Sequence, residues 1–494
     1  MRKYTYLAFD LGAESGRALI GRFEGGVLSV EEIHRFANEP VRYNGELHWD
    51  VTRLWWEMQR AMSMAAANDA AKLDGIGLDT WGVDYALLGE AGTLLENPYH
   101  YRDSRTEGML ERVFSIVPRD EVFARTGIQI MPINTLYQVY AAHLKTPRLL
   151  ELGRRVINMP DLFNFWLTGV IVSEFTIATT TQYYDPRQGR WSTELFSKLG
   201  LPTHLFAPLV QPGTVLGSLL PGVARGVAIS ECPVIAPACH DTGSAFAAAG
   251  GPSAFISSGT WSLLGTEVEA PVINSEAERL NFTNEGGVCG TFRLLKNITG
   301  LWLLQCCRRN FQLKGQEYSY VELCDLARSK PPFRSLIDPE HESFMRPDAM
   351  TEAIDRFCTM TAQPLPQDPP AYTRALLESL ALKYRVTLNH LERLTGMSYD
   401  EIHIVGGGAK NALLNQFTAE ATGRRVVAGP FEATALGNLG MQMLATGAVT
   451  SLSEVRKVIA QSYPVQVFEP IEADKWQEAL TRFEQFCAIG GGQS

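Results

Sequence analysis

Cysteine pairs, basic runs and long apolar stretches are all scarce in this sequence. Its eight cysteines include no C-x-x-C pair, and Cys306 and Cys307 are adjacent, which argues against a zinc site and a disulfide framework. Lys and Arg form no long runs, and 44 basic against 54 acidic residues give a net charge of −10. This balance argues against a protein that coats nucleic acid or anionic membranes. No apolar stretch is long enough to cross a bilayer.

Two nucleotide-binding signatures are also missing, and we expect no leader peptide. The chain contains neither a Walker A motif nor the dinucleotide pattern G-x-G-x-x-G. Met1 to Tyr4 runs straight into an apolar segment, without the apolar core and cleavage site of a signal peptide. Because sparse thiols suit a reducing compartment, we expect a cytoplasmic protein. We expect no nucleic-acid or membrane partner, and a monomer or homodimer that binds small molecules.

A Gly-rich loop at residues 10–17 separates two apolar segments and predicts a strand, a tight turn and a second strand. Gly12 and Gly16 allow backbone N–H groups to face an anion with no Cβ in the way. Asp10, at the exit of the first strand, is placed to hold a divalent cation beside that anion, through water. An ordinary β-hairpin with a surface aspartate fits this segment equally well when it is taken alone.

The second half of the chain repeats this pattern. Residues 255–265 predict another strand–turn–strand unit, which suggests an internal duplication, although two hairpins can also resemble each other by chance. Residues 403–422 predict a strand, a three-glycine loop and a helix, a shape that suits a nucleotide. A chain of 494 residues is too long for one core, so we expect two domains, at residues 1–246 and 247–494.

Asp241 is the candidate catalytic base. It follows His240 at the end of the apolar strand 234–238, and polar residues at the carboxyl ends of strands are where α/β proteins bind ligands. Two phosphate-type hairpins and a glycine loop fit an ATP site between two lobes, and phosphoryl transfer needs a base for the attacking hydroxyl. The structural alternative is that His-Asp-Thr-Gly only caps a helix.

Eight motifs in the same order resemble the FGGY carbohydrate kinases, from Tyr6 to about Gly447. They are residues 10–17, Gly77-Leu78-Asp79-Thr80-Trp81-Gly82-Val83-Asp84, Tyr101-Arg102-Asp103-Ser104-Arg105, His240-Asp241-Thr242, Ser258-Gly259-Thr260-Trp261-Ser262, Asn284-Glu285-Gly286-Gly287, residues 295–305 and Gly406-Gly407-Gly408. Each motif is weak by itself, but their shared order along the chain is specific.

The resemblance implies an α/β, two-lobed actin-like ATPase (ribonuclease H-like) fold with a duplicated core and an interlobe cleft. The implied reaction is transfer of the ATP γ-phosphoryl to a ketose hydroxyl with Mg²⁺, and the 1-hydroxyl of L-rhamnulose is the favoured acceptor. The N-terminal lobe, residues 1–246, would hold the sugar and part of the phosphate site. The C-terminal lobe, residues 247–494, would hold the nucleotide.

The resemblance also implies a role for each matching residue. The sugar contacts would be Gly82, His240, Asp241, Thr242 and Asn297, with Asp241 as proton acceptor. The ATP contacts would be Ala13, Glu14, Ser15, Gly16, Arg17, Thr260, Gln305 and Gly407, and Asp10 would serve Mg²⁺. Because Glu14 adds negative charge beside the phosphates, we expect it to point outward or toward a metal, while Arg17 supplies a cation.

Other interpretations stay open at the level of sequence. L-Fuculose and L-xylulose differ from L-rhamnulose by a few hydroxyl orientations. A non-catalytic actin-like ATP-binding sensor would keep the hairpins but would need neither the His240–Asp241 pair nor Asn297. Trp81 fits a sugar-facing wall or the core. Asn297 could instead cap the helix that carries Gln305, and Gln305 itself could be a surface residue and not an ATP contact.

Overall fold

The computed structural model describes residues 2–249, 251, 253–344 and 349–490. The chain forms two compact units, each assembled from separate stretches. Unit 1 comprises residues 1–250, 267–294 and 433–463, and unit 2 comprises residues 251–266, 295–432 and 464–494. Each unit is mixed α/β and is organised around a sheet of its own. Both units therefore draw on more than one part of the sequence.

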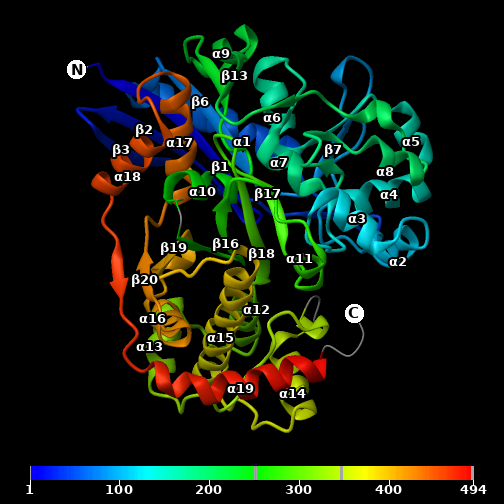
Figure 1. Cartoon of the computed structure of the whole chain (residues 1–494). Helices are drawn as coiled ribbons and strands as arrows, with labels where there is room; N and C mark the ends of the chain where they lie inside the picture. Colours follow the sequence, from blue (N-terminus) through cyan, green and yellow to red (C-terminus); the bar gives the residue numbers. More distant parts are fainter. Residues whose placement is uncertain (1, 250, 252, 345–348, 491–494) are drawn as a thin grey trace. The chain divides into compact units, whose positions relative to one another are not determined.

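The sheet of unit 1 contains the first Gly-rich hairpin (Figure 1). Its strands, in spatial order, are β13 (Thr214–Ser218), β14 (Pro233–Ala236), β6 (Gly75–Thr80), β1 (Tyr4–Leu11), β2 (Ser15–Glu24) and β3 (Val27–Ala37). β1 pairs antiparallel with β2 and parallel with β6, and β14 pairs parallel with β6. The carboxyl ends of β1, β6 and β14 consequently lie at one edge of the sheet.

The central strands of this sheet are covered on both faces, which explains their continuous apolar sequences. Leu7 and Phe9 of β1 and Leu78 of β6 are fully buried in one hydrophobic cluster. α17 (Ala433–Ala445), far away in the sequence, also lies against these strands, and Gln442 Nε2 donates to the Leu7 carbonyl at 3.1 Å (Figure 1).

The sheet of unit 2 repeats the strand order of unit 1. Its seven described strands, in spatial order, are β17 (Thr283–Gly286), β18 (Phe292–Thr299), β16 (Trp261–Val268), β15 (Ala254–Ser258), β19 (Glu401–Val405), β20 (Arg425–Ala428) and β21 (Gln466–Phe468). β15 pairs antiparallel with β16 and parallel with β19, β19 pairs parallel with β20, and β21 pairs antiparallel with β20. From β18 to β21 this order matches β3, β2, β1, β6, β14 and β13, with β17 as an additional edge strand, so the predicted duplication is confirmed.

Helices and short strands surround these sheets. In unit 1 they are β4 (Val41–Tyr43), β5 (Glu46–His48), α1 (Val51–Ala65), β7 (Tyr85–Leu88), α2 (Met109–Phe114), α3 (Arg119–Thr126), α4 (Thr135–Lys145), α5 (Pro147–Leu152), β8 (Arg155–Asn158), α6 (Met159–Thr168), β9 (Ser173–Glu174), α7 (Phe175–Ala178), β10 (Tyr184–Asp185), β11 (Arg190–Trp191), α8 (Thr193–Lys198), β12 (Leu209–Val210), α9 (Pro221–Val227), α10 (Asp241–Ala249), α11 (Ser275–Arg279) and α18 (Leu452–Ser462). In unit 2 they are α12 (Trp302–Leu313), α13 (Tyr320–Arg328), α14 (Met350–Met360), α15 (Pro369–Thr395), α16 (Ala412–Thr422) and α19 (Ala473–Gly490).

The first helix begins earlier than its sequence predicts. The spacing of Leu54, Met58 and Met62 predicts a helix with Thr52 as its N-cap. The structure makes Asp50 the N-cap, because its carboxylate accepts a hydrogen bond from the Arg53 backbone at 2.9 Å and another from the Thr52 hydroxyl at 2.7 Å. That prediction was wrong by two residues, since a carboxylate upstream takes the capping role.

Two helices of unit 1, α10 and α17, cross with their backbones almost in contact. A Cβ added to Gly437 of α17 would lie 1.8 Å from the Ser244 carbonyl oxygen of α10. Only glycine leaves room for such an approach. Because α10 begins at Asp241, this crossing fixes the helix whose first residue is the candidate base.

A cluster of buried charges stabilises unit 2 beside the predicted sugar contact Asn297. Lys383 of α15 lies 3.0 Å from an Asp338 oxygen and 2.5 Å from a Glu340 oxygen, and Lys296 of β18 lies 3.5 Å from Glu340. Burial by itself would raise the pKa of Glu340, but the two lysines outweigh it and lower that pKa to about 2. The cluster ties the long helix to the strand that carries Asn297.

We expect Lys383→Met to destabilise the protein by about 2 kcal/mol, because it leaves two half-buried carboxylates without their main cation. The melting temperature, followed by circular dichroism, measures this effect. The contribution of Glu340 to the free energy of unfolding is fully present above the ordinary glutamate pKa and is lost as pH falls toward about 2. The difference between wild type and variant should therefore shrink in acid.

The matched control is Lys475→Met, which removes a lysine from the exposed pair with Glu472. Exposed pairs contribute about 0–1 kcal/mol, so this variant should melt close to the wild type. Equal melting temperatures for the Lys383 and Lys475 variants would contradict a stabilising role for the buried cluster.

Candidate active site

Two aspartates lie side by side where β1 and β6 end. Asp10 and Asp79 are register partners on these parallel strands, and Asp79 is fully buried. Asn438 of α17 donates to Asp79 Oδ2 at 2.6 Å, whereas Asp79 Oδ1 has no hydrogen-bond partner among the described residues. Burial, reinforced by the charge of Asp10, raises the pKa of Asp79 well above its ordinary value. Sequence reasoning gave Asp79 no role, although its strand-end position was visible.

Arg17 binds Asp10 directly. The Arg17 Nε and Nη2 atoms donate to Asp10 Oδ2 at 3.0 and 2.7 Å, and both side chains are largely buried. The predicted metal carboxylate therefore already has a cation beside it. Such a charge-assisted, two-pronged contact orients the carboxylate at the strand exit.

The loop between β1 and β2 is closed by a backbone hydrogen bond and a hydrogen bond from a side chain. The Gly12 N–H donates to the Ser15 carbonyl at 2.9 Å, and Asn38 Nδ2 donates to the Gly12 carbonyl at 2.8 Å. Ala13 is half-buried, and Glu14 is exposed.

Gly16 serves a different structural purpose from the one predicted. It lies within β2 rather than in the turn, and a Cβ there would lie 2.3 Å from the ring of Phe36. We expected this glycine to let the backbone turn, but the structure shows that it makes room for an aromatic ring.

His240 and Asp241 meet at the end of the third parallel strand. His240 Nε2 lies 3.5 Å from Asp241 Oδ1, and Asp241 Oδ1 also accepts the Thr242 hydroxyl at 3.0 Å. A Cβ added to Gly82 would lie 3.1 Å from His240 Nε2, so Gly82 lets its chain approach the imidazole closely. The structure thus brings together all four sugar contacts predicted in unit 1.

The surroundings of Asp241 suit a carboxylate that exchanges protons. Its side chain is 32% exposed. Burial raises the pKa of Asp241, and the negative charge of Asp10 raises it further. His240 and the hydrogen bonds from Thr242 lower this pKa but do not cancel the rise. A base whose pKa is raised toward neutral pH accepts a proton more readily.

Glu285 and Arg293, to which sequence reasoning gave no role, complete the surroundings of His240. Arg293 of β18 is fully buried, and its Nη2 lies 3.2 Å from His240 Nδ1 and 3.3 Å from a Glu285 oxygen. Glu285 of β17 also lies 3.2 Å from His240 Nδ1. The motif Asn284-Glu285-Gly286-Gly287 was the available signal, but it did not indicate a contact with His240.

In unit 2, the second hairpin and the glycine loop lie together. A Cβ added to Gly408 would lie 2.1 Å from the Ser258 Oγ, so residues 406–408 pass directly over the end of β15. Gly407 has open space around its Cα. The Thr260 carbonyl accepts the Trp302 N–H at 3.2 Å, which places the start of α12 at the same hairpin. Thr260 and Gly407 therefore lie in the same part of unit 2, where loops expose their backbone.

The remaining residues fall on regular elements of unit 2 or in the core of unit 1. Asn297 lies on β18 and not at a helix N-terminus, so the capping alternative is wrong. Gln305 lies on the first turns of α12 and is half-buried. Trp81 is 5% exposed and donates to Asp84 Oδ2 at 2.9 Å, which makes it a core residue.

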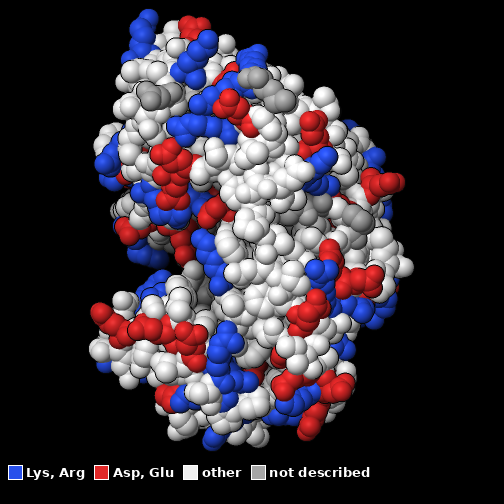
Figure 2. Space-filling view, turned by 90° about the vertical axis from the view of Figure 1, so that its left-hand side faces the viewer, with Lys and Arg blue, Asp and Glu red and all other residues white. Residues whose placement is uncertain are grey.

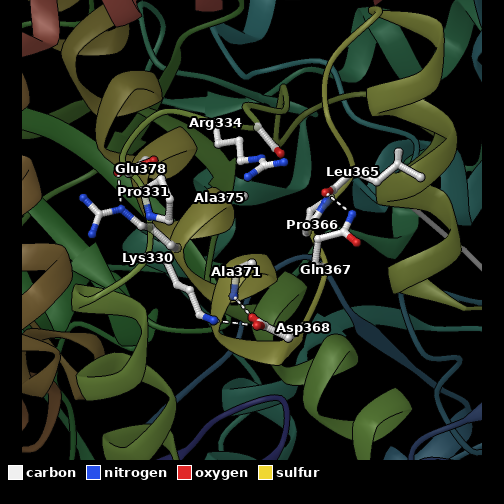
Figure 3. A pocket seen from close by; sticks show the side chains of 12 residues that line it. Lys330, Pro331, Arg334, Leu365, Pro366, Gln367, Asp368, Ala371, Ala375 and Glu378 are labelled. Carbon is white, nitrogen blue, oxygen red and sulfur yellow. Dashed lines mark hydrogen bonds and ion pairs between the residues drawn. The ribbon is translucent and has the colours of Figure 1, made fainter.

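The charges of the described residues in Figure 2 do not form a nucleic-acid-binding face, and the cavity beside α15 is separate from the strand ends. On the face shown in Figure 2, basic and acidic side chains are interspersed and form no continuous basic patch. The cavity in Figure 3, of about 150 Å³, lies at the start of α15 and is lined by none of the predicted residues. Its charges pair with one another, as Lys330 does with Asp368.

The described residues contain no helix long and apolar enough to cross a membrane. They also contain no set of three side chains grouped to ligate a metal by themselves. Mg²⁺ commonly keeps several waters and uses one or two carboxylates together with substrate phosphates. The Asp10 and Asp79 carboxylates, one of them with an unpartnered buried oxygen, fit that mode of binding.

Comparison with known proteins identifies the family. Residues 5–248 match the N-terminal domain of the FGGY family of carbohydrate kinases, and residues 254–446 match its C-terminal domain. The chain is 43% identical to the rhamnulokinase of Bacteroides thetaiotaomicron over 98% of this chain and 99% of that protein. It is 38% identical to the rhamnulokinase of Lactiplantibacillus plantarum over 98% of each. The chain belongs to the FGGY family of carbohydrate kinases.

Solved structures agree at the level of the fold. A xylulose kinase from Lactobacillus acidophilus superimposes with a TM-score of 0.82 at 17% identity, covering 99% of both chains. A gluconate kinase from the same organism gives 0.83 at 17% identity, again over 99% of both chains. The predicted two-lobed α/β kinase fold is confirmed, and the chain is an ATP-dependent sugar kinase.

Proposed function

We propose that this kinase transfers the γ-phosphoryl of ATP to the 1-hydroxyl of L-rhamnulose, giving L-rhamnulose 1-phosphate and ADP in L-rhamnose catabolism. The observation that carries the substrate is the full-length similarity to proteins named rhamnulokinase, at 36–43% identity. The eight cysteines, all free, support a cytoplasmic location. The His240–Asp241 pair supports catalysis over a role as an ATP sensor.

In this proposal, Asp241 accepts the proton of the sugar hydroxyl while that oxygen bonds to the γ-phosphorus. The bond from the γ-phosphorus to the bridging oxygen breaks, and ADP leaves. Gly82, His240, Thr242 and Asn297 orient the sugar. Residues 13–17, with Thr260, Gln305 and Gly407, contact ATP. These groups position the two substrates and neutralise phosphate charge, and phosphoryl transfer is catalysed mainly in these two ways.

Mg²⁺, when bound, neutralises charge on the phosphates. We propose that Asp10 holds it through water, oriented by Arg17 at 2.7 Å. The chain itself supplies the carboxylates, the sugar-binding groups and the base.

The test is ADP release with Mg²⁺ and ATP across a panel of L-rhamnulose, L-fuculose and L-xylulose. We expect kcat/KM for L-rhamnulose to exceed the values for L-fuculose and L-xylulose by about tenfold or more. A hydroxyl in the wrong orientation leaves polar groups of the site without a hydrogen-bond partner. Equal turnover of all three sugars would contradict the proposed substrate but not the kinase class. Sugar-independent ATP hydrolysis would instead favour the sensor.

The pH dependence of kcat/KM for the sugar should show an acidic limb above the ordinary range of aspartate. The base must be unprotonated, and burial raises the pKa of Asp241, so activity is lost as pH falls through that raised value. Steady-state rates in buffers of constant ionic strength measure the limb. An acidic limb at or below the ordinary aspartate pKa of about 3.9 would contradict this assignment.

A further inference from the structure

Arg293 is one of the largest fully buried side chains in the described part of the molecule. A buried guanidinium is expected only where its charge and its N–H groups are met by partners. Its Nε donates to the Gly286 carbonyl at 2.8 Å, and Nη2 approaches Glu285 at 3.3 Å and His240 Nδ1 at 3.2 Å. A buried ion pair is thus built against the back of the imidazole, on the side away from Asp241.

The partners of His240 decide which ring nitrogen carries the proton. Arginine can only donate hydrogen bonds, and carboxylates can only accept them. With the proton on Nε2, Nδ1 accepts from Arg293 and Nε2–H faces Asp241 Oδ1 at 3.5 Å. With the proton on Nδ1, only Glu285 is satisfied, and the Nε2 lone pair faces a carboxylate. In the first arrangement a donor faces an acceptor at both nitrogens, and Arg293, 3.3 Å from Glu285, offsets the repulsion between the Glu285 carboxylate and the Nδ1 lone pair.

We propose that Arg293 and Glu285 are positioning residues of the sugar site, which hold His240 as the neutral tautomer with its proton on Nε2. Glu285 neutralises Arg293, and Arg293 donates to His240 Nδ1. This inference rests on the proposed function, because it assigns His240 to the sugar.

The tautomer matters for the chemistry. An Nε2–H donor binds a lone pair of a sugar oxygen and leaves the hydroxyl hydrogen of the sugar available to Asp241. In the opposite tautomer, the Nε2 lone pair would compete with Asp241 for that hydrogen. The buried pair behind His240 therefore keeps Asp241 as the acceptor in this part of the site.

Two variants separate positioning from simple stability. Arg293→Met leaves Glu285 buried without its cation and is expected to be poorly stable. The double variant Arg293→Met/Glu285→Leu removes both charges together, which buried pairs tolerate far better. In the double variant we expect the KM for L-rhamnulose to rise about tenfold, because one oriented hydrogen bond to the sugar is lost. The KM for ATP should not change.

The structural control is Arg374→Met. Arg374 of α15 in unit 2 pairs with the buried Glu378 at 2.7 Å, so this variant also leaves a buried glutamate without its cation. This variant should lower the melting temperature and leave the KM for L-rhamnulose at its wild-type value.

The second readout is the ¹⁵N spectrum of histidine-labelled protein, with the His240 signals identified by their absence in His240→Asn. Wild type should show the Nε2–H pattern, and the double variant should shift toward Nδ1–H or a mixture. A wild-type Nδ1–H pattern, or a double variant with wild-type KM, would overturn the inference. If His240→Asn itself leaves the sugar KM unchanged, the proposed sugar site fails instead.

Discussion

Asp241→Asn is expected to lower kcat for L-rhamnulose phosphorylation by about a hundred- to ten-thousand-fold, the usual contribution of a positioned general base. Asparagine has nearly the same shape and keeps an oxygen that can accept from Thr242, but it cannot take a proton. The sugar and ATP should still bind, so the KM for ATP should stay within about twofold, since only the chemical step is lost. A coupled assay of ADP release measures both parameters.

The control for this substitution is Asp120→Asn, an exposed aspartate in the first turn of α3. It makes the same chemical change far from the strand ends and should retain wild-type kcat. If Asp241→Asn kept more than about a third of wild-type kcat, another group would have to accept the proton. A lowered melting temperature in Asp241→Asn alone would point to a structural role for the carboxylate.

The positions of the site residues within each element could be predicted because the strands that carry them are buried on both faces. β1, β6 and β14 form short, continuous apolar runs, and the polar residues that follow them mark the edge where parallel strands end. Asp10, Asp79 and His240 are visible in the sequence for this reason. The duplicated strand order follows from the same pattern, since both hairpins precede parallel strands of that kind.

Contacts between distant segments could not be predicted. Arg293 and His240 are separated by 53 positions, and Asn438 and Asp79 by 359. Local periodicity shows which face of an element is buried but not which element covers it. Local capping also failed at α1, where Asp50 and Thr52 both carry capping side chains and only the folded geometry decides between them.

Gly437→Ala is expected to destabilise the protein by about 3 kcal/mol, at the upper end of the usual range for overpacking. The added Cβ would lie 1.8 Å from the Ser244 carbonyl oxygen. The backbone of α17 fixes the position of the Cβ, and the oxygen belongs to the backbone of α10, so neither atom can rotate away. Helices α10 and α17 must then separate. Since a change of 1 kcal/mol shifts the melting temperature of a unit of about 300 residues by about 1.5 °C, the midpoint should fall by roughly 5 °C.

The consequence for catalysis distinguishes this crossing from an ordinary packing contact. α10 begins at Asp241, and α17 carries Asn438, which donates to Asp79. Moving the two helices apart should therefore raise the KM for L-rhamnulose in the protein that remains folded. The matched control is Gly226→Ala in α9, where an added Cβ meets nothing within 4 Å. Alanine favours helix by up to about 1 kcal/mol over glycine, so this variant should melt at or above the wild-type temperature. If both substitutions left the midpoint unchanged, the close crossing of α10 and α17 would not exist in solution.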